Sequence, residues 1–365
     1  MGSARHLRIE KGKVKMPLVT DPLEVEEIYA EAREKGMALA GFCTESPEGT
    51  EAILKATAEM AREYGIKNPP AIVSSTGNYR PSPQLRFYTA TGNALVGFKA
   101  LVSDVETLVS PGSPYENVRV MLHLDHAQPD IDGELLVPEI MKKFATIMFD
   151  CSYYPMEENI KRTARFVEES RALVRVEGAV DEIFEAGTGM AKNIQTDPDV
   201  AERFVRETGV FLIVPNVGTE HRAAREEAKY NSALARQISA RVGKMLVLHG
   251  SSSLFPEDLS KLKDDGVIKV NIWTILGRMG SQGVAEGIIR ELGNILDEKQ
   301  IRALQKEGYL GQRYFEPGVI KEAYGGYLGP KFAAIHEYVR RDAWMERVIA
   351  QMKMYFEKFG YQALA

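Results

Sequence analysis

Eight short apolar runs alternate with segments that have helix signals, and this alternation constrains the fold more than any other feature of the chain. Interpreted as β-strands, the runs are residues 37–42, 70–77, 119–124, 144–149, 172–176, 211–214, 245–248 and 267–270. Strands that alternate with helices form parallel sheets, and eight such units predict a closed (β/α)₈ barrel, an α/β fold. A doubly wound open sheet is the competing arrangement, but no GxGxxG pattern follows the first strand.

The chain also has helices at both ends of this pattern. Asp21-Pro22 and Gly36 are start and stop signals for an extra helix before the first strand. After about residue 275 the chain is helical, so we predict a barrel domain over residues 1–285 and a helical extension over 286–365. Apolar residues near four-residue spacing in the last helix fit packing on the barrel or a subunit interface.

Three of the apolar runs are followed by a histidine: His126, His221 and His249. In a barrel the C-terminal strand ends meet at one mouth, where such enzymes keep their active sites. Three imidazoles suit Zn²⁺ or another divalent metal and leave a coordination position open for substrate. We expect Asp125 to act as a base rather than a ligand, because neighbouring residues at a strand end point apart. His123 alternates to the same side as Asp125 and either orients it or packs.

A second group of residues suits an anion. The Gly250-Ser251-Ser252-Ser253 turn offers backbone N–H groups and hydroxyls ahead of a helix that begins near Pro256. Asn271 and Thr274 follow the eighth strand and are expected to close the same pocket. Barrels often bind phosphate at the loops after strands seven and eight.

Composition excludes some classes of partner. The net charge of −5 gives no basic footprint for nucleic acid or an anionic membrane. No apolar run approaches a membrane span, and no signal-peptide core is present at the N-terminus. The two cysteines argue against a disulfide framework and fit a reducing compartment, so we expect a cytoplasmic protein.

Five motifs in order resemble the class II, metal-dependent ketose-bisphosphate aldolases, over roughly residues 35 to 285. They are HLDHA, MFDCSYYPMEENI, VGTEH, VLHGSSS and KVNIWT. The resemblance implies a TIM barrel with zinc held by His126, His221 and His249. It also implies that Asp125 exchanges the proton on the hydroxyl of the bond being cleaved or formed.

The same resemblance implies residues for substrate and phosphate. It assigns phosphate binding to Gly250, Ser251, Ser252, Asn271 and Thr274. Thr76 and Asp150 are expected to line the substrate pocket, with Gly218 of the VGTEH motif as a further candidate. Members of the family are generally dimers or tetramers, and a monovalent cation is a further candidate cofactor.

The chain departs from the family pattern at two substrate-facing positions. Trp273 stands where the family usually has an aspartate that contacts substrate hydroxyls, and it either fills a barrel end or contacts substrate. Arg222 replaces the glycine after the second histidine and is interpreted as an anion contact rather than a surface charge.

The acidic residues after the fifth strand also differ. Glu177 is a candidate at the metal, more as a support than as a direct ligand, and Ala179 replaces the second acidic residue expected there. The family's glycine-rich loop with its acid/base glutamate is replaced by Val180–Glu185, in which Glu182 or Glu185 is the candidate substitute.

These observations predict an aldehyde-lyase that acts on a small phosphorylated ketose through a zinc-stabilised enediolate of dihydroxyacetone phosphate. Loss of the loop glutamate and the Trp273 replacement favour an alternative, a non-catalytic aldolase-like subunit or binding protein. An aldolase with an atypical substrate, including one without phosphate, is the third possibility.

Overall fold

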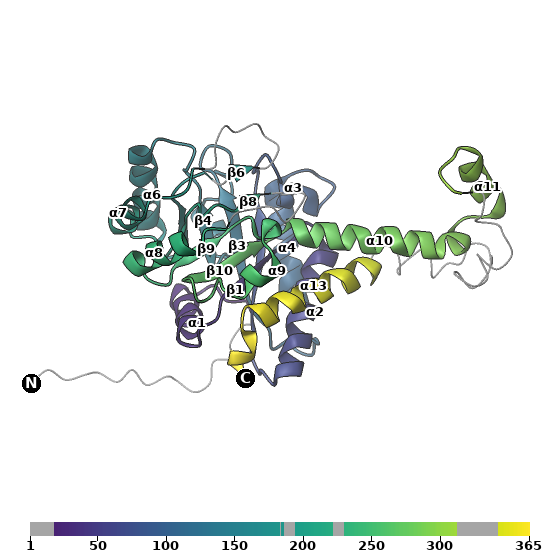
Figure 1. The fold of residues 1–365 in the computed structure, drawn as a ribbon, viewed down its shortest axis with the longest axis horizontal. Coiled ribbons are helices and arrows are strands. Elements are labelled where there is room, and N and C mark those ends of the chain that lie inside the picture. The colour runs from purple at the N-terminus through teal and green to yellow at the C-terminus, as the bar shows by residue number, and fades with distance from the viewer. Residues whose placement is uncertain (1–17, 183, 186–193, 222–229, 312–341) are drawn as a thin grey trace, which may run out of the picture.

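The computed structural model describes residues 18–182, 184–185, 194–221, 230–311 and 342–365, with the backbone alone at 184–185, 220–221 and 253. Eight parallel strands form a closed barrel in the order β1-β10-β9-β7-β5-β4-β3-β2, which confirms the predicted fold (Figure 1). The barrel strands are β1 (Leu39–Cys43), β2 (Pro70–Thr76), β3 (Arg119–Ala127), β4 (Thr146–Phe149), β5 (Arg175–Ala179), β7 (Leu212–Val214), β9 (Leu246–Leu248) and β10 (Val267–Ile272). Two-residue strands β6 (Phe184–Glu185) and β8 (Glu220–His221) pair with each other outside the barrel.

Helices surround the barrel, and their ends follow local chemistry. Asp21 accepts a hydrogen bond from the backbone N–H of Leu23 and caps α1, as predicted. Ser46 caps α2 in the same way, and Gly65 ends α2 in the left-handed conformation that favours glycine. The helices around the barrel are α1 (Pro22–Glu34), α2 (Pro47–Tyr64), α3 (Gln84–Tyr88), α4 (Ala94–Leu108), α5 (Pro138–Met141), α6 (Met156–Ser170), α7 (Pro198–Thr208), α8 (Ser232–Val242) and α9 (Pro256–Leu259).

The C-terminal part extends away from the barrel. Helix α10 (Thr274–Ile295) begins at the barrel mouth and continues outward, with α11 (Glu298–Lys306) beyond its far end (Figure 1). Helix α13 (Ala343–Lys358) returns to the barrel, and the 3₁₀ turn η4 (Tyr361–Leu364) follows it. Because α10 runs without a break across residue 285, the predicted domain boundary falls inside a helix, and the division stays a prediction.

Helix α13 packs through the apolar face that the sequence indicates. Its Phe356 ring lies 5.4 Å from Phe42 of β1, edge to face, and Met352 is fully buried. On α10, Gly280 lies so close to Trp344 of α13 that a Cβ atom would come within 2.5 Å of the indole. The two helices are therefore in direct contact along this stretch.

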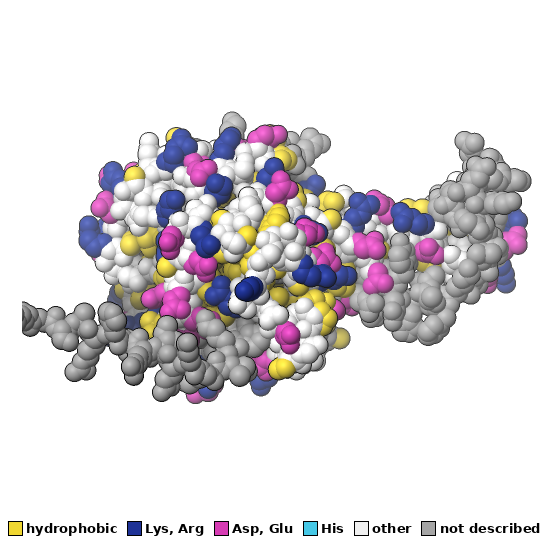
Figure 2. Space-filling view, turned by 90° about the horizontal axis from the view of Figure 1, so that it is seen from below, with side chains coloured by type: hydrophobic (Ala, Val, Ile, Leu, Met, Phe, Trp, Pro, Cys, Tyr) yellow, Lys and Arg dark blue, Asp and Glu magenta, His cyan; other side chains and the backbone are white. Residues whose placement is uncertain are grey.

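Figure 2 shows one face of the molecule, on which basic and acidic side chains are interspersed over the barrel and the projecting helix. No helix in the described part of the chain is long and apolar enough to cross a membrane.

The strand ends differ from the prediction at two places. Strand β3 continues to Ala127, three residues beyond the predicted end, and β5 begins at Arg175 and includes Glu177. The first change places Asp125 and His126 inside the end of a strand. The second places Glu177 within the barrel wall instead of at the mouth.

Candidate functional site

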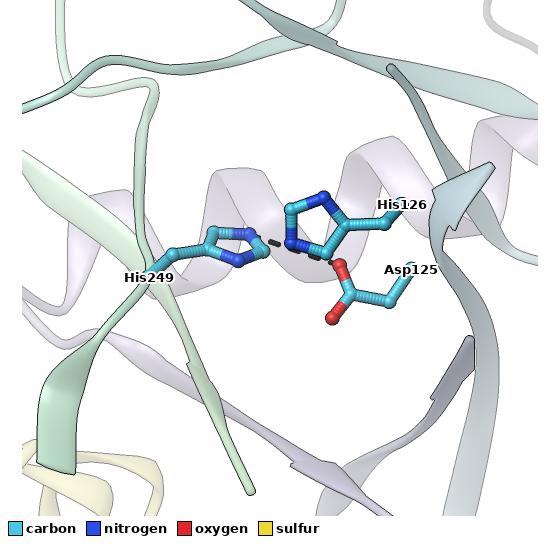
Figure 3. A group of neighbouring side chains, drawn as sticks. All are labelled: Asp125, His126 and His249. Carbon is cyan, nitrogen blue, oxygen red and sulfur yellow. Dashed lines mark ion pairs between the residues drawn. The ribbon is translucent and has the colours of Figure 1, made fainter. Parts of the chain in front are cut away.

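Two histidines and an aspartate converge at the C-terminal mouth of the barrel. Asp125 and His126 come from the end of β3 and His249 directly follows β9, so the three side chains face each other across the mouth (Figure 3). One ligand atom of each lies within 4.8 Å of the other two, and all three residues are buried. The rings of His126 and His249 are 4.9 Å apart and nearly perpendicular. Two imidazoles and a carboxylate at this spacing form a donor set that suits a divalent metal ion.

A local distortion of β3 brings the two neighbouring residues to the same side. His126 has a φ of 47°, the one positive value at a non-glycine residue in the described ranges, and the pairing of β3 with β4 shifts between Leu124 and Ala127. This bulge interrupts the alternation of side chains along the strand. The expectation that Asp125 and His126 point apart is therefore wrong.

Asp150 holds the ring of His126 from behind. The Nδ1–H of His126 donates to Oδ2 of Asp150 over 2.8 Å, which fixes the ring and, in the neutral form that binds a metal, leaves Nε2 unprotonated. Burial alone would raise the pKa of Asp150, but the hydrogen bond and charge of His126, with Ser152, lower it. A carboxylate behind a metal-ligating histidine is the usual arrangement in metal sites.

The carboxylate of Asp125 is held by several donors. Asn271 Nδ2 donates to its Oδ1 over 2.9 Å, Cys43 Sγ lies 3.9 Å from Oδ2, and His123 Nε2 lies 3.6 Å from Oδ1. Burial alone would raise the pKa of Asp125, but His249, His126 and His123 hold it well below its usual range. Asp125 is therefore an ionised acceptor. His123 lies on the same side of β3 as Asp125, as predicted.

The same cavity contains the residues proposed for an anion. It has a volume of about 520 Å³, including space open to solvent. It is lined by Gly250, Ser251, Ser252, Asn271, Trp273 and Thr274 together with Thr76. Gly250 adopts a φ of 71°, and Ser251 begins the 3₁₀ turn η1 (Ser251–Ser253). The helix predicted near Pro256 is α9, which has only four residues. The longer helix whose first residue, Thr274, lines this cavity is α10. Its length makes its N-terminus the stronger positive end.

The remaining predicted residues divide into three groups. The side chain of His221, the whole of Arg222 and the side chain of Glu185 lie outside the described residues, although the backbone of His221 belongs to β8, which contacts η1. Gly218 is buried with a φ of 91° and does not line the cavity that contains Asp125. Glu182 is exposed and lies on a neighbouring cavity with Asp150, and burial and the charge of Asp150 raise its pKa.

Glu177 does not join the metal-binding group. Both of its oxygens accept from Lys269 Nζ, at 2.8 and 2.9 Å, and neither side chain is exposed at all. Glu177 lies within β5 instead of after it, and its carboxylate reaches across the barrel interior to Lys269 of β10. The predicted place at the metal is thus replaced by a buried ion pair.

Sequence analysis missed three residues that shape the site. The ring of Tyr79 is stacked on His126 at 4.3 Å, and Gln84 accepts from the backbone N–H of Thr76 over 3.0 Å. Tyr79 lies in the connection after β2 and Gln84 is the first residue of α3, and the available signal was that this segment follows a polar strand end. Lys269 was the third, a lone cation within an apolar strand.

Comparisons with known proteins agree with this geometry. The family model described as fructose-bisphosphate aldolase class-II matches residues 23–352. A probable fructose-bisphosphate aldolase of Bacillus subtilis is 29% identical over 267 residues, which cover 71% of this chain and 82% of that protein. A fructose-bisphosphate aldolase of Staphylococcus epidermidis is 27% identical over 267 residues, which again cover 71% of this chain and 82% of that protein.

Solved structures share the fold. Fructose-bisphosphate aldolase from Campylobacter jejuni superposes with a TM-score of 0.67 at 20% identity, covering 93% of this chain and 94% of that one. The YdjI aldolase from Escherichia coli K12 superposes with a TM-score of 0.55 at 20% identity, covering 91% of this chain and 96% of that one. The family model matches most of this chain, which shows that the chain belongs to the class II fructose-bisphosphate aldolase family and is an aldolase. Members of this family are generally metal-dependent.

Proposed function

We propose that this aldolase cleaves or forms a carbon–carbon bond in a phosphorylated ketose, with dihydroxyacetone phosphate as one product or reactant and Zn²⁺ as the metal. The observation that supports this best is a single cavity with two parts. Asp125, His126 and His249 converge in one part, and the Gly250 turn with the start of α10 forms the other. Metal donors beside an anion site fit a substrate with a phosphate close to its reacting carbonyl.

The donor set fits a divalent ion. His126 and His249 would hold it, with His221 as the proposed third ligand, and Asp150 orients His126 through the 2.8 Å hydrogen bond. When bound, such an ion polarises a carbonyl and favours negative charge on its oxygen. A monovalent cation remains a further candidate cofactor.

Asp125 is the proposed base. As an ionised carboxylate held by Asn271 and Cys43, it is placed to take the proton from the hydroxyl next to the bond that breaks. The C–C bond then opens, the aldehyde forms on one side, and the electron pair stays on the dihydroxyacetone phosphate half. An acid must then protonate that carbon, and Glu182, with its raised pKa, is the proposed donor.

The phosphate is proposed to bind where backbone N–H groups and hydroxyls gather. Gly250, Ser251 and Ser252 form the turn, and Thr274 opens a helix of 22 residues whose N-terminus attracts anions. Arg222 is proposed as a further anion contact. We further propose that the enzyme acts in the cytoplasm as a homodimer or homotetramer, without nucleic-acid or membrane partners.

Metal removal tests the proposal. Protein treated with a chelator and desalted should lose cleavage of a ketose phosphate, measured by coupled detection of dihydroxyacetone phosphate, and should regain it when Zn²⁺ is returned. Full activity in protein shown by mass spectrometry to lack metal would refute it.

A further inference from the structure

A second cavity lies on the other side of His126 from the phosphate turn. It has a volume of about 790 Å³, including space open to solvent, and Asp150, Asp181 and Glu182 line it with Arg80 and Ser152. None of these five residues belongs to the phosphate turn. We call this cavity the acidic subsite.

The acidic subsite adjoins the proposed metal site directly. Tyr79, Pro81 and His126 line both cavities, and the rings of Tyr79 and His126 are stacked at 4.3 Å. The acidic subsite is thus a neighbouring space for the other half of a substrate whose phosphate lies at the Gly250 turn.

The charges in the acidic subsite are unbalanced. Three carboxyl groups and one guanidinium line it among the described residues. Glu182 is the proposed proton donor, so Asp150 and Asp181 carry the negative charge, and both Arg80 and Glu182 are exposed. Asp181 accepts a hydrogen bond from Thr196 Oγ1 over 2.7 Å, which holds its carboxylate in place. Burial raises the pKa of Asp181, and burial with the charge of Asp150 raises that of Glu182.

We infer that the acidic subsite receives the aldehyde-derived half of the substrate, and that this half is an uncharged polyhydroxylated aldehyde rather than an aldehyde phosphate. The inference rests on the proposed function and narrows it to a ketose with one phosphate. Carboxylates accept hydrogen bonds from sugar hydroxyls, and Ser152 adds a neutral polar contact. A second phosphate would place two further negative charges beside the carboxylates of Asp150 and Asp181, and like charges brought together cost binding energy.

The test compares two aldehydes in the condensation direction. The metal-loaded full chain is given dihydroxyacetone phosphate with either glyceraldehyde or glyceraldehyde 3-phosphate, and kcat/KM is measured for each. We expect glyceraldehyde to have the higher value by at least about tenfold. An equal or higher value for the phosphorylated aldehyde overturns the inference and leaves the proposed function standing, whereas condensation with neither aldehyde overturns both.

Two variants locate the discrimination. Asp181→Asn removes one charge and should shift the ratio toward the phosphorylated aldehyde by about two- to tenfold. The matched control is Asp264→Asn, an exposed aspartate that precedes β10 at the opposite end of the barrel, and its ratio should stay unchanged. An unchanged ratio in Asp181→Asn counts against the inference.

Arg80 provides an independent check. If Arg80 instead binds a second phosphate, Arg80→Gln will lose activity with glyceraldehyde 3-phosphate by about 100-fold or more relative to glyceraldehyde, and that result overturns the inference. In our account this substitution removes one positive charge and shifts the ratio toward glyceraldehyde by no more than about tenfold.

Discussion

The barrel contains two groups of buried charge, and they are built in opposite ways. At the mouth, Asp125, His126 and His249 face a cavity. Deeper in the barrel, Glu177 and Lys269 face only each other and their protein neighbours, with both carboxylate oxygens bonded to the ammonium group. His123 lies between the two groups, 3.6 Å from Asp125 and 3.7 Å from Glu177.

The difference separates charge that serves the fold from charge that is available for chemistry. A buried ion pair with matched partners has no charge left to offer a ligand, although removing one partner leaves the other uncompensated. The mouth group gathers three metal-donor side chains beside open space. Burial alone would thus have identified both groups, and only the cavity distinguishes the reactive one.

The largest expected effect comes from removing the proposed base. Asp125→Asn should reduce ketose phosphate cleavage by about 10²–10⁴-fold, because the amide cannot take the hydroxyl proton. Metal content, measured by mass spectrometry, should stay near one ion per chain. Retained turnover would move the base elsewhere.

Breaking the interior pair should affect stability instead. Lys269→Met leaves Glu177 buried without its cation and should lower the free energy of unfolding by about 3–5 kcal/mol in chemical denaturation. The double variant Lys269→Met with Glu177→Leu is the control, and it should recover most of that loss. If the single variant is as stable as the parent protein, the interior pair is not the closed unit described here.

The support behind His126 should have an intermediate effect. Asp150→Asn keeps a hydrogen-bond acceptor but loses the charge, so Zn²⁺ affinity should fall by about 10–100-fold in competition with a chromophoric chelator. Asp264→Asn serves again as the surface control. Equal affinities in the two variants would contradict a role for Asp150 at the metal.

The smallest expected effect comes from the glycine that lies between the two groups. A Cβ atom at Gly41 would lie 2.8 Å from Asn271 Oδ1 and 3.2 Å from Lys269 Cε. Gly41→Ala should therefore displace Asn271 and cost about 1–3 kcal/mol of stability, as overpacking usually does. Because Asn271 holds Asp125, kcat should also fall, by about tenfold, while KM changes less. A stability loss with unchanged kcat would show that the mouth tolerates a shift of Asn271.

Much of the fold was predictable because the apolar runs fixed where strands could be. All eight barrel strands overlap their predicted ranges, and α1 occupies the residues between the predicted signals at Asp21 and Gly36. The alternation of strands and helices also predicted that the polar residues lie at the C-terminal ends of the strands. That placed Asp125, His126 and His249 at one mouth.

The errors have local and long-range causes. The bulge at His126 depends on a backbone conformation that a sequence of ordinary strand residues does not signal. Glu177 and Lys269 are 92 residues apart, so their pairing depends on the register of β5 and β10 in the closed barrel. Tyr79 lies between β2 and α3, and Gln84 begins the five-residue helix α3, so spacing does not predict how they fold back over the mouth.

The central claim is that β3 and β9 supply ligands to one metal ion at the barrel mouth. The most direct measurement is the metal content and X-ray absorption spectrum of the zinc-loaded protein and of His249→Ala. We predict one ion per chain with a first coordination sphere that includes imidazole nitrogens, and loss of that ion or of one imidazole in the variant. A spectrum with no imidazole contribution, or one that is identical in the two proteins, would contradict the account.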